Sequence, residues 1–260
     1  MATVHKLREN QFKRRLGTGA RQPGLWLTLE SPNATEILAG AGYDWMLLDM
    51  EHTTVDPSQV SAHLRAAVGG TAELAVRVPW NEPVLVKRLL DVGARTLMFP
   101  CVQSAAEAQA AVASTRYPPH GIRGVSGNMR ANSYARVKDY AETYRNEQCV
   151  IVQLESPKAI AAIEEIAAVD GVDALFIGPN DLAATMGLFG QPGAAQVKSV
   201  IAEAIVRIRK TGKGAGILNY NIAEVRQLFA AGFDFIAVNS DTSMLARQSE
   251  AILAQVTAAE

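Results

Sequence analysis

The amino-acid sequence predicts an α/β protein with one domain, residues 1–260, folded as a closed (β/α)8 TIM barrel. Three observations predict this fold: eight short apolar runs, amphipathic stretches between them, and glycine turns that precede several of the runs. Eight strand–helix units in about 250 residues match such a barrel in number and in length. An open, doubly wound sheet is the structural alternative.

The eight apolar runs have the composition of parallel strands. Nearly all of them are continuously apolar, as expected for strands that are covered on both faces. The runs lie at 24–29, 45–50, 73–79, 96–102, 149–155, 174–179, 213–218 and 235–240.

Helices are predicted between the strands. The clearest Ala-rich, amphipathic stretches are 104–115, 157–168, 194–211 and 222–231. Glycine-led turns such as Gly42-Tyr-Asp44 come directly before strands, where a glycine ends the preceding helix. The first 15 residues are basic but are not followed by the apolar core of a signal peptide, so they predict a short surface helix.

Composition narrows the class of protein. The chain is 48% hydrophobic with a formal net charge of −1, which gives no general attraction to nucleic acid or to an anionic membrane. No apolar stretch approaches the roughly 20 residues that span a bilayer. The two cysteines, Cys101 and Cys149, lie in apolar runs and predict buried, inert thiols in a reducing compartment. We therefore expect a cytoplasmic protein.

One insertion interrupts the regular repeat. About 45 residues separate the fourth and fifth strands, and they contain the segment Tyr117-Pro-Pro-His-Gly-Ile-Arg123 and, further on, Arg130. Connections of this length in compact domains are often lids or binding loops. We expect such a role here.

Charged and polar residues gather where the predicted strands end, which is where barrel enzymes place their active sites. These residues are Asp49, Glu51 and His52 after the second strand, Arg77 in the third, Gln153 and Glu155 in the fifth, and Gly178-Pro179-Asn180-Asp181 after the sixth. Ionised side chains are seldom buried without a partner or a metal, so the pattern indicates an active site.

Each residue also has a structural explanation when taken alone. Asp49, Glu51, Glu155 or Asp181 could cap or open the helix that follows it. His52 could be a hydrogen-bonded core residue, and Arg77 could form a structural ion pair with Glu51. The coincidence of these residue types on neighbouring strands favours the catalytic interpretation.

Together the residues suit proton abstraction next to a carbonyl group. Glu155 and Asp181 suit a hard divalent cation that keeps sites open for a chelating substrate. The backbone amides of 178–181 could hold a substrate carboxylate at a helix N-terminus. Arg77 could stabilise an oxyanion, and His52, oriented by Asp49, could transfer the proton.

With these residues in place, the chain resembles the metal-dependent (class II) pyruvate aldolases of the 2-dehydro-3-deoxyglucarate aldolase and 4-hydroxy-2-oxoheptanedioate aldolase family. The matching motifs are GLWLTL at 24–29, DWMLLDMEH at 44–52, VRVPW at 76–80, YPPHGIRG at 117–124, QLES at 153–156, IGPNDL at 177–182 and VNSDT at 238–242. Three departures from the family pattern, at Thr53, 186–190 and Asn239, bear on aldehyde preference.

The resemblance implies specific roles for these residues. Glu155 and Asp181 would bind Mg²⁺, Mn²⁺ or Co²⁺, Arg77 would stabilise the enolate oxygen of pyruvate, and Gln153 would hold the water around the metal. His52 and Asp49 would assist proton transfer, with Glu51 orienting Arg77. The residues implied to bind substrate are Gln153, Gly178, Pro179, Asn180, Trp26 and Leu218.

The resemblance also implies a homohexamer in which the C-terminal helix, here 242–258, is exchanged between subunits. Asp91 and Val125 would then help to complete a neighbouring site, although Asp91 could cap a helix and Val125 could simply pack. Arg123 and Arg130 could recognise an acidic aldehyde tail or could be solvated surface residues.

The expected activity is a carbon–carbon lyase. It would reversibly cleave 4-hydroxy-2-oxo acids to pyruvate, or a hydroxypyruvate-like 2-oxo acid, and an aldehyde through a metal-bound enolate. The alternative enzyme has the same fold but acts on a CoA thioester or decarboxylates oxaloacetate. A CoA substrate would need a basic groove, for which Arg116, Arg123 and Arg130 are the candidates. A barrel that binds a ligand without turnover is the alternative from another class.

Overall fold

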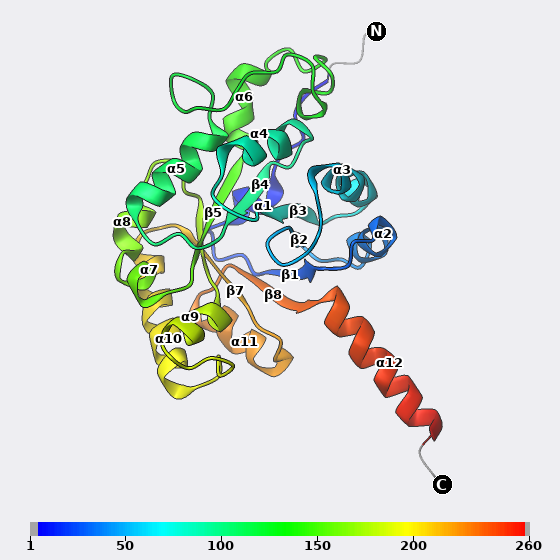
Figure 1. Cartoon of the computed structure of the whole chain (residues 1–260), viewed down its shortest axis with the longest axis vertical. Coiled ribbons are helices and arrows are strands. Elements are labelled where there is room, and N and C mark those ends of the chain that lie inside the picture. The colour runs from blue at the N-terminus through cyan, green and yellow to red at the C-terminus, as the bar shows by residue number, and fades with distance from the viewer. Residues whose placement is uncertain (1–4, 258–260) are drawn as a thin grey trace.

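Eight parallel strands form one closed barrel in sequential order (Figure 1). The computed structural model describes residues 5–257. The strands are β1 Gln22–Leu27, β2 Trp45–Asp49, β3 Glu73–Arg77, β4 Thr96–Phe99, β5 Cys149–Leu154, β6 Ala174–Ile177, β7 Gly214–Leu218 and β8 Phe235–Ser240. The predicted (β/α)8 barrel is confirmed, and the open sheet is excluded because β8 pairs with β1.

Helices surround the barrel. They are α1 Gln11–Arg15, α2 Pro32–Ala39, α3 Pro57–Ala66, α4 Pro83–Asp91, α5 Ala105–Thr115, α6 Tyr140–Glu147, α7 Pro157–Ala161, α8 Ile163–Ala167, α9 Pro179–Thr185, α10 Ala195–Lys210, α11 Ile222–Ala231 and α12 Asp241–Thr257, with 3₁₀ turns η1 Ala67–Gly69 and η2 Arg130–Asn132. The single helix predicted over 157–168 is two helices, because the backbone at Ala162 has a non-helical ψ of 15°.

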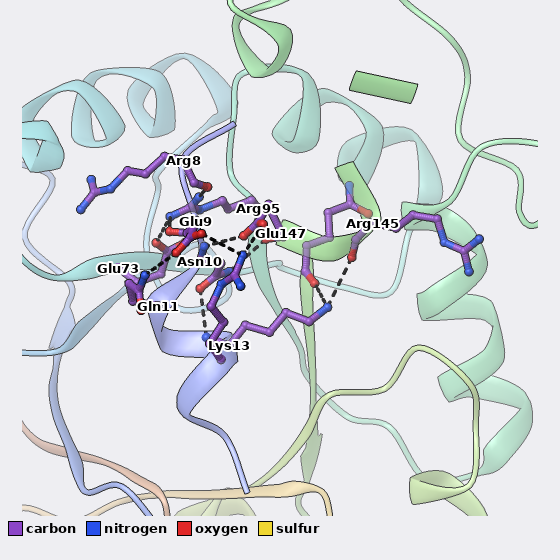
Figure 2. Close-up of polar contacts among 11 residues, drawn as sticks. Arg8, Glu9, Asn10, Gln11, Lys13, Glu73, Arg95, Arg145 and Glu147 are labelled. Atoms are coloured by element: carbon purple, nitrogen blue, oxygen red, sulfur yellow. Dashed lines mark hydrogen bonds and ion pairs between the residues drawn. The ribbon is translucent and has the colours of Figure 1, made fainter. Parts of the chain in front are cut away.

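The N-terminal segment closes the floor of the barrel. The short helix predicted within the first 15 residues is α1, but it is not confined to the surface, because it buries Phe12; residues 1–4 lie outside the described range. The Phe12 ring packs against Trp45 and Phe235 inside the barrel, at centroid distances of 5.7 and 5.1 Å. Figure 2 shows the hydrogen bonds and ion pairs that tie residues 8–13 to Arg95 and to Arg145 and Glu147 of α6.

Two glycines make room for the aromatic rings inside the barrel. A Cβ on Gly24 would lie 2.2 Å from the indole of Trp45, and a Cβ on Gly216 would lie 2.2 Å from the ring of Phe235. Any other residue at these positions would displace the rings, since barrel interiors are packed in layers without a pore. The lower half of the barrel is therefore solid, and an internal site has room only near the C-terminal ends of the strands.

The insertion between β4 and β5 carries α5, η2 and α6, while α12 leaves the barrel altogether (Figure 1). Helix α12 has 17 residues, and Asp241 is its one buried residue within the described range. Its exposed side chains include Leu245, Leu253 and Val256. Among residues 5–257, no helix combines the length and the apolar character needed to cross a membrane.

Candidate active site

Side chains alternate between two faces along each strand. On the inward faces of β2 and β3, apolar residues of the packed interior are followed by charged residues at the mouth of the barrel. In β2, Trp45 and Leu47 belong to the inner core, and Asp49 is the next residue on that face. In β3, Ala75 lies inside and Arg77 follows it. The strand register pairs Asp49 with Arg77, so the two side chains stand next to each other at the carboxyl edge.

Arg77 is held by two carboxylates and an aromatic ring. Its Nε and Nη2 donate to the two oxygens of Asp49 at 2.9 and 2.6 Å, and Nη1 lies 2.8 Å from Glu51. The guanidinium carbon lies 4.9 Å from the centroid of the Trp26 ring, whose Nε1 donates to Asp49 at 3.1 Å. With 6% of its surface exposed, Arg77 is a fixed, buried cation.

The same contacts correct the role predicted for Asp49. Its carboxylate accepts hydrogen bonds from Arg77, from Trp26 and from the backbone amides of Glu51 and His52, and among the described residues it has none from the imidazole of His52. Asp49 therefore positions Arg77 instead of orienting His52. Although burial raises the pKa of Asp49, the Arg77 guanidinium holds it below its usual value. His52 is exposed at the mouth, close enough to Glu51 for their charges to interact.

Glu155 is the most deeply buried carboxylate at this edge that lacks a cationic contact. Its Oε1 accepts from Gln153 Nε2 at 2.5 Å, and its Oε2 accepts from the backbone N–H of Cys101 at 3.0 Å. Burial, reinforced by the charges of Asp181 and Glu51, raises the pKa of Glu155 to about 7. The side-chain oxygen of Gln153 is buried and has no hydrogen-bond partner within residues 5–257.

Gly178 provides the space that Glu155 and Gln153 occupy. A Cβ at this position would lie 2.5 Å from Glu155 Oε1 and 3.0 Å from Gln153 Nε2. The backbone hydrogen bonding of this segment also corrects the prediction that residues 178–181 bind a substrate carboxylate. The Gly178 N–H donates to the carbonyl of Leu154, and Pro179 has no N–H, so only the amides of Asn180 and Asp181 are left for a ligand.

Asp181 lies in the first turn of α9, exposed at the same edge as Glu155. The hydroxyl of Thr185 lies within hydrogen-bond distance of the backbone carbonyls of both residues, at 3.0 Å from that of Glu155 and 2.9 Å from that of Asp181. Thr185 thus connects the ends of the two segments that carry these carboxylates.

Helix capping does not account for the carboxylates. The helix after β2 is capped by Asp56, and the helix after β5 is capped by Ser156, whose hydroxyl accepts from the amide of Ala159. The N-cap of α9 is Gly178, and no side chain makes a capping hydrogen bond there. Asp49, Glu51, Glu155 and Asp181 are therefore available for another purpose.

The long-loop arginines are not part of this site. Arg123 is 1% exposed, pairs with Asp91 at 2.7 Å and stacks on Tyr117, so it is neither solvated nor free to bind an aldehyde tail. Arg130 donates to the carbonyl of Val92 at the end of α4, and Arg116 pairs with Asp170. Val125 is 79% exposed. The basic groove that a CoA substrate would need is not formed by these three arginines, because each of them is engaged by a carboxylate or a backbone carbonyl.

The remaining residues predicted to bind substrate fall into two groups. Trp26 is buried against Arg77 and Phe176, so it shapes the site from beneath. Leu218, Pro179 and Asn180 border a cavity of about 550 Å³ that lies between α10 and α11. Asn239 uses its side-chain oxygen to accept from the amide of Ser240.

Cys101 was missed as a site residue. It was predicted to be a buried, inert thiol, but it is partly exposed and its backbone amide contacts Glu155. Burial and the charge of Glu155 raise the pKa of its thiol to about 12. The one available signal was its position directly after a predicted strand core, at the edge where the polar residues of the other strands gather.

Known proteins share the whole of this architecture. The family model described as HpcH/HpaI aldolase/citrate lyase matches residues 22–248. The chain is 47% identical to the hydroxypyruvate/pyruvate aldolase of Sagittula stellata over 94% of its own length and 98% of that protein. It is 46% identical to the 4-hydroxy-2-oxo-heptane-1,7-dioate aldolase of Shigella sonnei, over 95% of each chain.

A solved structure agrees with these sequence matches. A HpcH/HpaI aldolase/citrate lyase family protein from Burkholderia cenocepacia superposes with a TM-score of 0.93 and 42% identity, covering 96% of this chain and 100% of that one. The match of residues 22–248 includes every strand of the barrel and the four carboxylates at its mouth. The chain belongs to the HpcH/HpaI aldolase/citrate lyase family.

Proposed function

We propose that this protein is a class II aldolase that reversibly cleaves 4-hydroxy-2-oxo acids to an aldehyde and pyruvate, or a hydroxypyruvate-like 2-oxo acid. The names of the two relatives support this activity and both 2-oxo acids. One observation carries the proposal: four carboxylates, Asp49, Glu51, Glu155 and Asp181, share a strand edge with one guanidinium, Arg77.

The excess of negative charge fits a divalent cation. Glu155 and Asp181 are the carboxylates without an arginine contact among the described residues, and oxygen ligands suit Mg²⁺, Mn²⁺ and Co²⁺. The unpartnered oxygen of Gln153 can accept from a water molecule next to that cation. Within residues 5–257 no group of three or more His, Cys, Asp or Glu side chains is arranged to hold a metal, so water and substrate would supply the other ligands. When bound, such an ion acts as a Lewis acid toward the 2-oxo group.

Arg77 supplies the fixed positive charge for the enolate. Two of its N–H groups donate to Asp49, and Nη1 forms an ion pair with Glu51 without a hydrogen bond, which leaves N–H bonds on Nη1 and Nη2 for the developing oxyanion. The two carboxylates and the Trp26 ring prevent the guanidinium from moving as charge develops. Preorganised donors of this kind stabilise a transition state without a cost of reorganisation.

His52 is the group that we assign to proton transfer. Its imidazole is exposed at the mouth and does not donate to Asp49, so it is free to exchange protons with solvent and with the aldol hydroxyl. Asn180 and Asp181 offer backbone amides to the carboxylate of the 2-oxo acid, and Leu218 borders the cavity between α10 and α11, to which we assign the aldehyde. Trp26, Gln153 and Gly178 shape the floor beneath them.

We also propose a homo-oligomer, a hexamer, in which α12 packs on a neighbouring subunit. The support is that α12 projects from its own barrel and exposes Leu245, Leu253 and Val256 (Figure 1). The exposed Val125 and the surface near Asp91 would lie at a subunit contact. Two free cysteines are consistent with a reducing, cytoplasmic compartment.

The alternative within enzymes is a lyase of the same fold that acts on a CoA thioester or decarboxylates oxaloacetate. The buried or paired states of Arg116, Arg123 and Arg130 argue against the CoA substrate. Decarboxylation of oxaloacetate would use the same Arg77 and the same cation, because it also passes through the enolate of pyruvate.

Exchange of the pyruvate methyl protons in D₂O, followed by proton NMR, tests the proposal without knowledge of the aldehyde. We expect exchange with Mg²⁺, none after EDTA, and recovery when Mg²⁺ is restored. A barrel that only binds ligand, or one that enolises a CoA thioester, would show no exchange with pyruvate although Mg²⁺ is bound, and either result would overturn the proposal.

A further inference from the structure

The regular pairing of β4 with β5 stops at the end of β4, directly beside Glu155. Pairing of the two strands runs up to Phe99 opposite Val152. Pro100 has no N–H to donate, and the Cys101 N–H donates to Glu155 Oε2 at 3.0 Å instead of to the neighbouring strand. One further backbone hydrogen bond follows, from the Val102 N–H to the carbonyl of Gln153 at 3.3 Å.

Cys101 makes this turn in a left-handed conformation. Its φ is +57°, a value that disfavours most residues other than glycine. Within the described range, the other non-glycine residues with positive φ are Ser133, Tyr134 and Ala135, consecutive in the insertion. An unfavourable conformation next to a functional carboxylate indicates that the surrounding structure imposes it for that carboxylate.

We propose that Cys101 is a positioning residue for Glu155, acting through its backbone and not through its thiol. The left-handed turn aims the N–H at Oε2, while Gln153 Nε2 holds Oε1, so the buried carboxylate is fixed from two sides. A carboxylate oxygen that accepts one hydrogen bond keeps a lone pair for a cation. The inference rests on the proposed function, because it assigns Glu155 to the cation.

Three substitutions separate the backbone from the thiol. Cys101→Gly favours the left-handed conformation, and Cys101→Ala tolerates it while removing the sulfur. Cys101→Val opposes it, because a β-branched residue with positive φ is a strong outlier. The matched control is Ala135→Val, which introduces the same conflict at a φ of +65°, in an exposed position of the insertion.

The test is the dissociation constant for Mn²⁺, measured by electron paramagnetic resonance on metal-stripped protein. We expect Cys101→Val to bind Mn²⁺ at least about 10-fold more weakly, as is typical when the partners of a metal ligand are lost. Cys101→Gly, Cys101→Ala and Ala135→Val should stay within about threefold of the unmodified protein, well below that 10-fold loss. Unchanged binding in Cys101→Val, or equal loss in Cys101→Ala, would overturn the inference.

A second readout separates this inference from the proposed function. The backbone amide resonance of Cys101 in the metal-free protein reports the hydrogen bond to Glu155 directly. We expect a downfield resonance that is lost in Cys101→Val. If the unmodified protein bound no Mn²⁺ but kept this resonance, the proposed metal site would fail while the positioning of Glu155 stood; absence of the resonance would contradict the positioning itself.

Discussion

Two bidentate arginine–carboxylate pairs, at opposite ends of the barrel, have nearly the same geometry and different surroundings. At the C-terminal end, Arg77 binds Asp49 through Nε and Nη2 at 2.9 and 2.6 Å. At the N-terminal end, Arg95 binds Glu73 through the same atoms at 2.8 and 2.6 Å. Two further N–H groups of Arg95 donate to the backbone carbonyls of residues 8 and 9 (Figure 2), whereas Arg77 has no hydrogen bond beyond those to Asp49 among the described residues.

Charge balance separates the two ends further. At the N-terminal end, four carboxylates each have a cation: Glu73 with Arg95, Glu147 with Arg14, Asp173 with Lys13 and Asp44 with Arg15. The buried Asp234 is the exception there, because it accepts from the backbone amide of Ala215 and has no ion pair among the described residues. At the C-terminal end, the four carboxylates have one arginine among them: Arg77 contacts Asp49 and Glu51, while Glu155 and Asp181 have no ion pair among the described residues. The excess of carboxylates over cations at the C-terminal end indicates where a cation binds.

The largest expected effect comes from the two arginines. Arg77→Lys keeps a positive charge but loses the planar fork, so pyruvate exchange should fall by about 10²–10³-fold. Arg95→Lys should leave exchange within about twofold and lower the free energy of unfolding by about 1–3 kcal/mol. Exchange rates and urea unfolding of both variants check this prediction. Equal losses of exchange in the two variants would contradict the distinction between the ends.

Glutamates at the two ends should differ in metal binding. Glu155→Gln removes a proposed ligand and should weaken Mn²⁺ binding by about 100-fold or more. Glu147→Gln alters a carboxylate that pairs with Arg14 at 2.8 Å on the floor, and should leave Mn²⁺ affinity unchanged. Isothermal titration of metal-stripped proteins gives both values. A Glu155→Gln variant with full affinity would place the cation elsewhere.

The last prediction concerns how the free energy of unfolding changes with pH. Burial, with Asp181 and Glu51, raises the pKa of Glu155 from 4.5 to about 7, so the folded protein holds a proton there that the unfolded chain releases. This group therefore stabilises the metal-free protein below pH 4.5, and the contribution, on the order of 3 kcal/mol, is lost as pH rises through about 7.

Comparing the unmodified protein with the Glu155→Gln variant isolates the contribution of Glu155. Burial also raises the pKa of Asp173 and Asp234, which add a slope of the same sign. Their contribution is also present in the Glu155→Gln variant, so the difference between the two proteins reports Glu155 alone. In urea unfolding with EDTA, the free energy of unfolding should fall less between pH 5 and pH 8 in the variant. Identical declines would mean that Glu155 does not carry a raised pKa. A divalent cation should reverse the sign, with binding that strengthens as pH rises.

Sequence alone predicted the elements whose signals are local. The eight apolar strands and the inward positions of Asp49, Arg77 and Gln153 follow from composition and alternation along single strands. Arg77 between two valines already required a carboxylate partner. The pairing of Arg77 with Asp49, in place of a pair between Asp49 and His52, depends on the register of β2 against β3, which no single segment contains.

Features that depend on distant contacts could not be predicted in this way. Arg123 is buried because it meets Asp91, 32 residues earlier in the chain. Phe12 is buried because the floor of the barrel lies open to the N-terminal segment. The role of Cys101 comes from its backbone torsion and not from its side chain, so residue type alone gave the wrong expectation.

The most direct test of the central claim is anomalous diffraction from crystals soaked with Mn²⁺ and pyruvate. We predict one strong peak between Glu155 and Asp181, with pyruvate beside it and an oxygen facing the free N–H groups of Arg77. The N-terminal end, where carboxylates are paired with cations or, like Asp234, accept from a backbone amide, should show no peak. A peak at the floor of the barrel, or none between Glu155 and Asp181 at saturating Mn²⁺, would contradict the account.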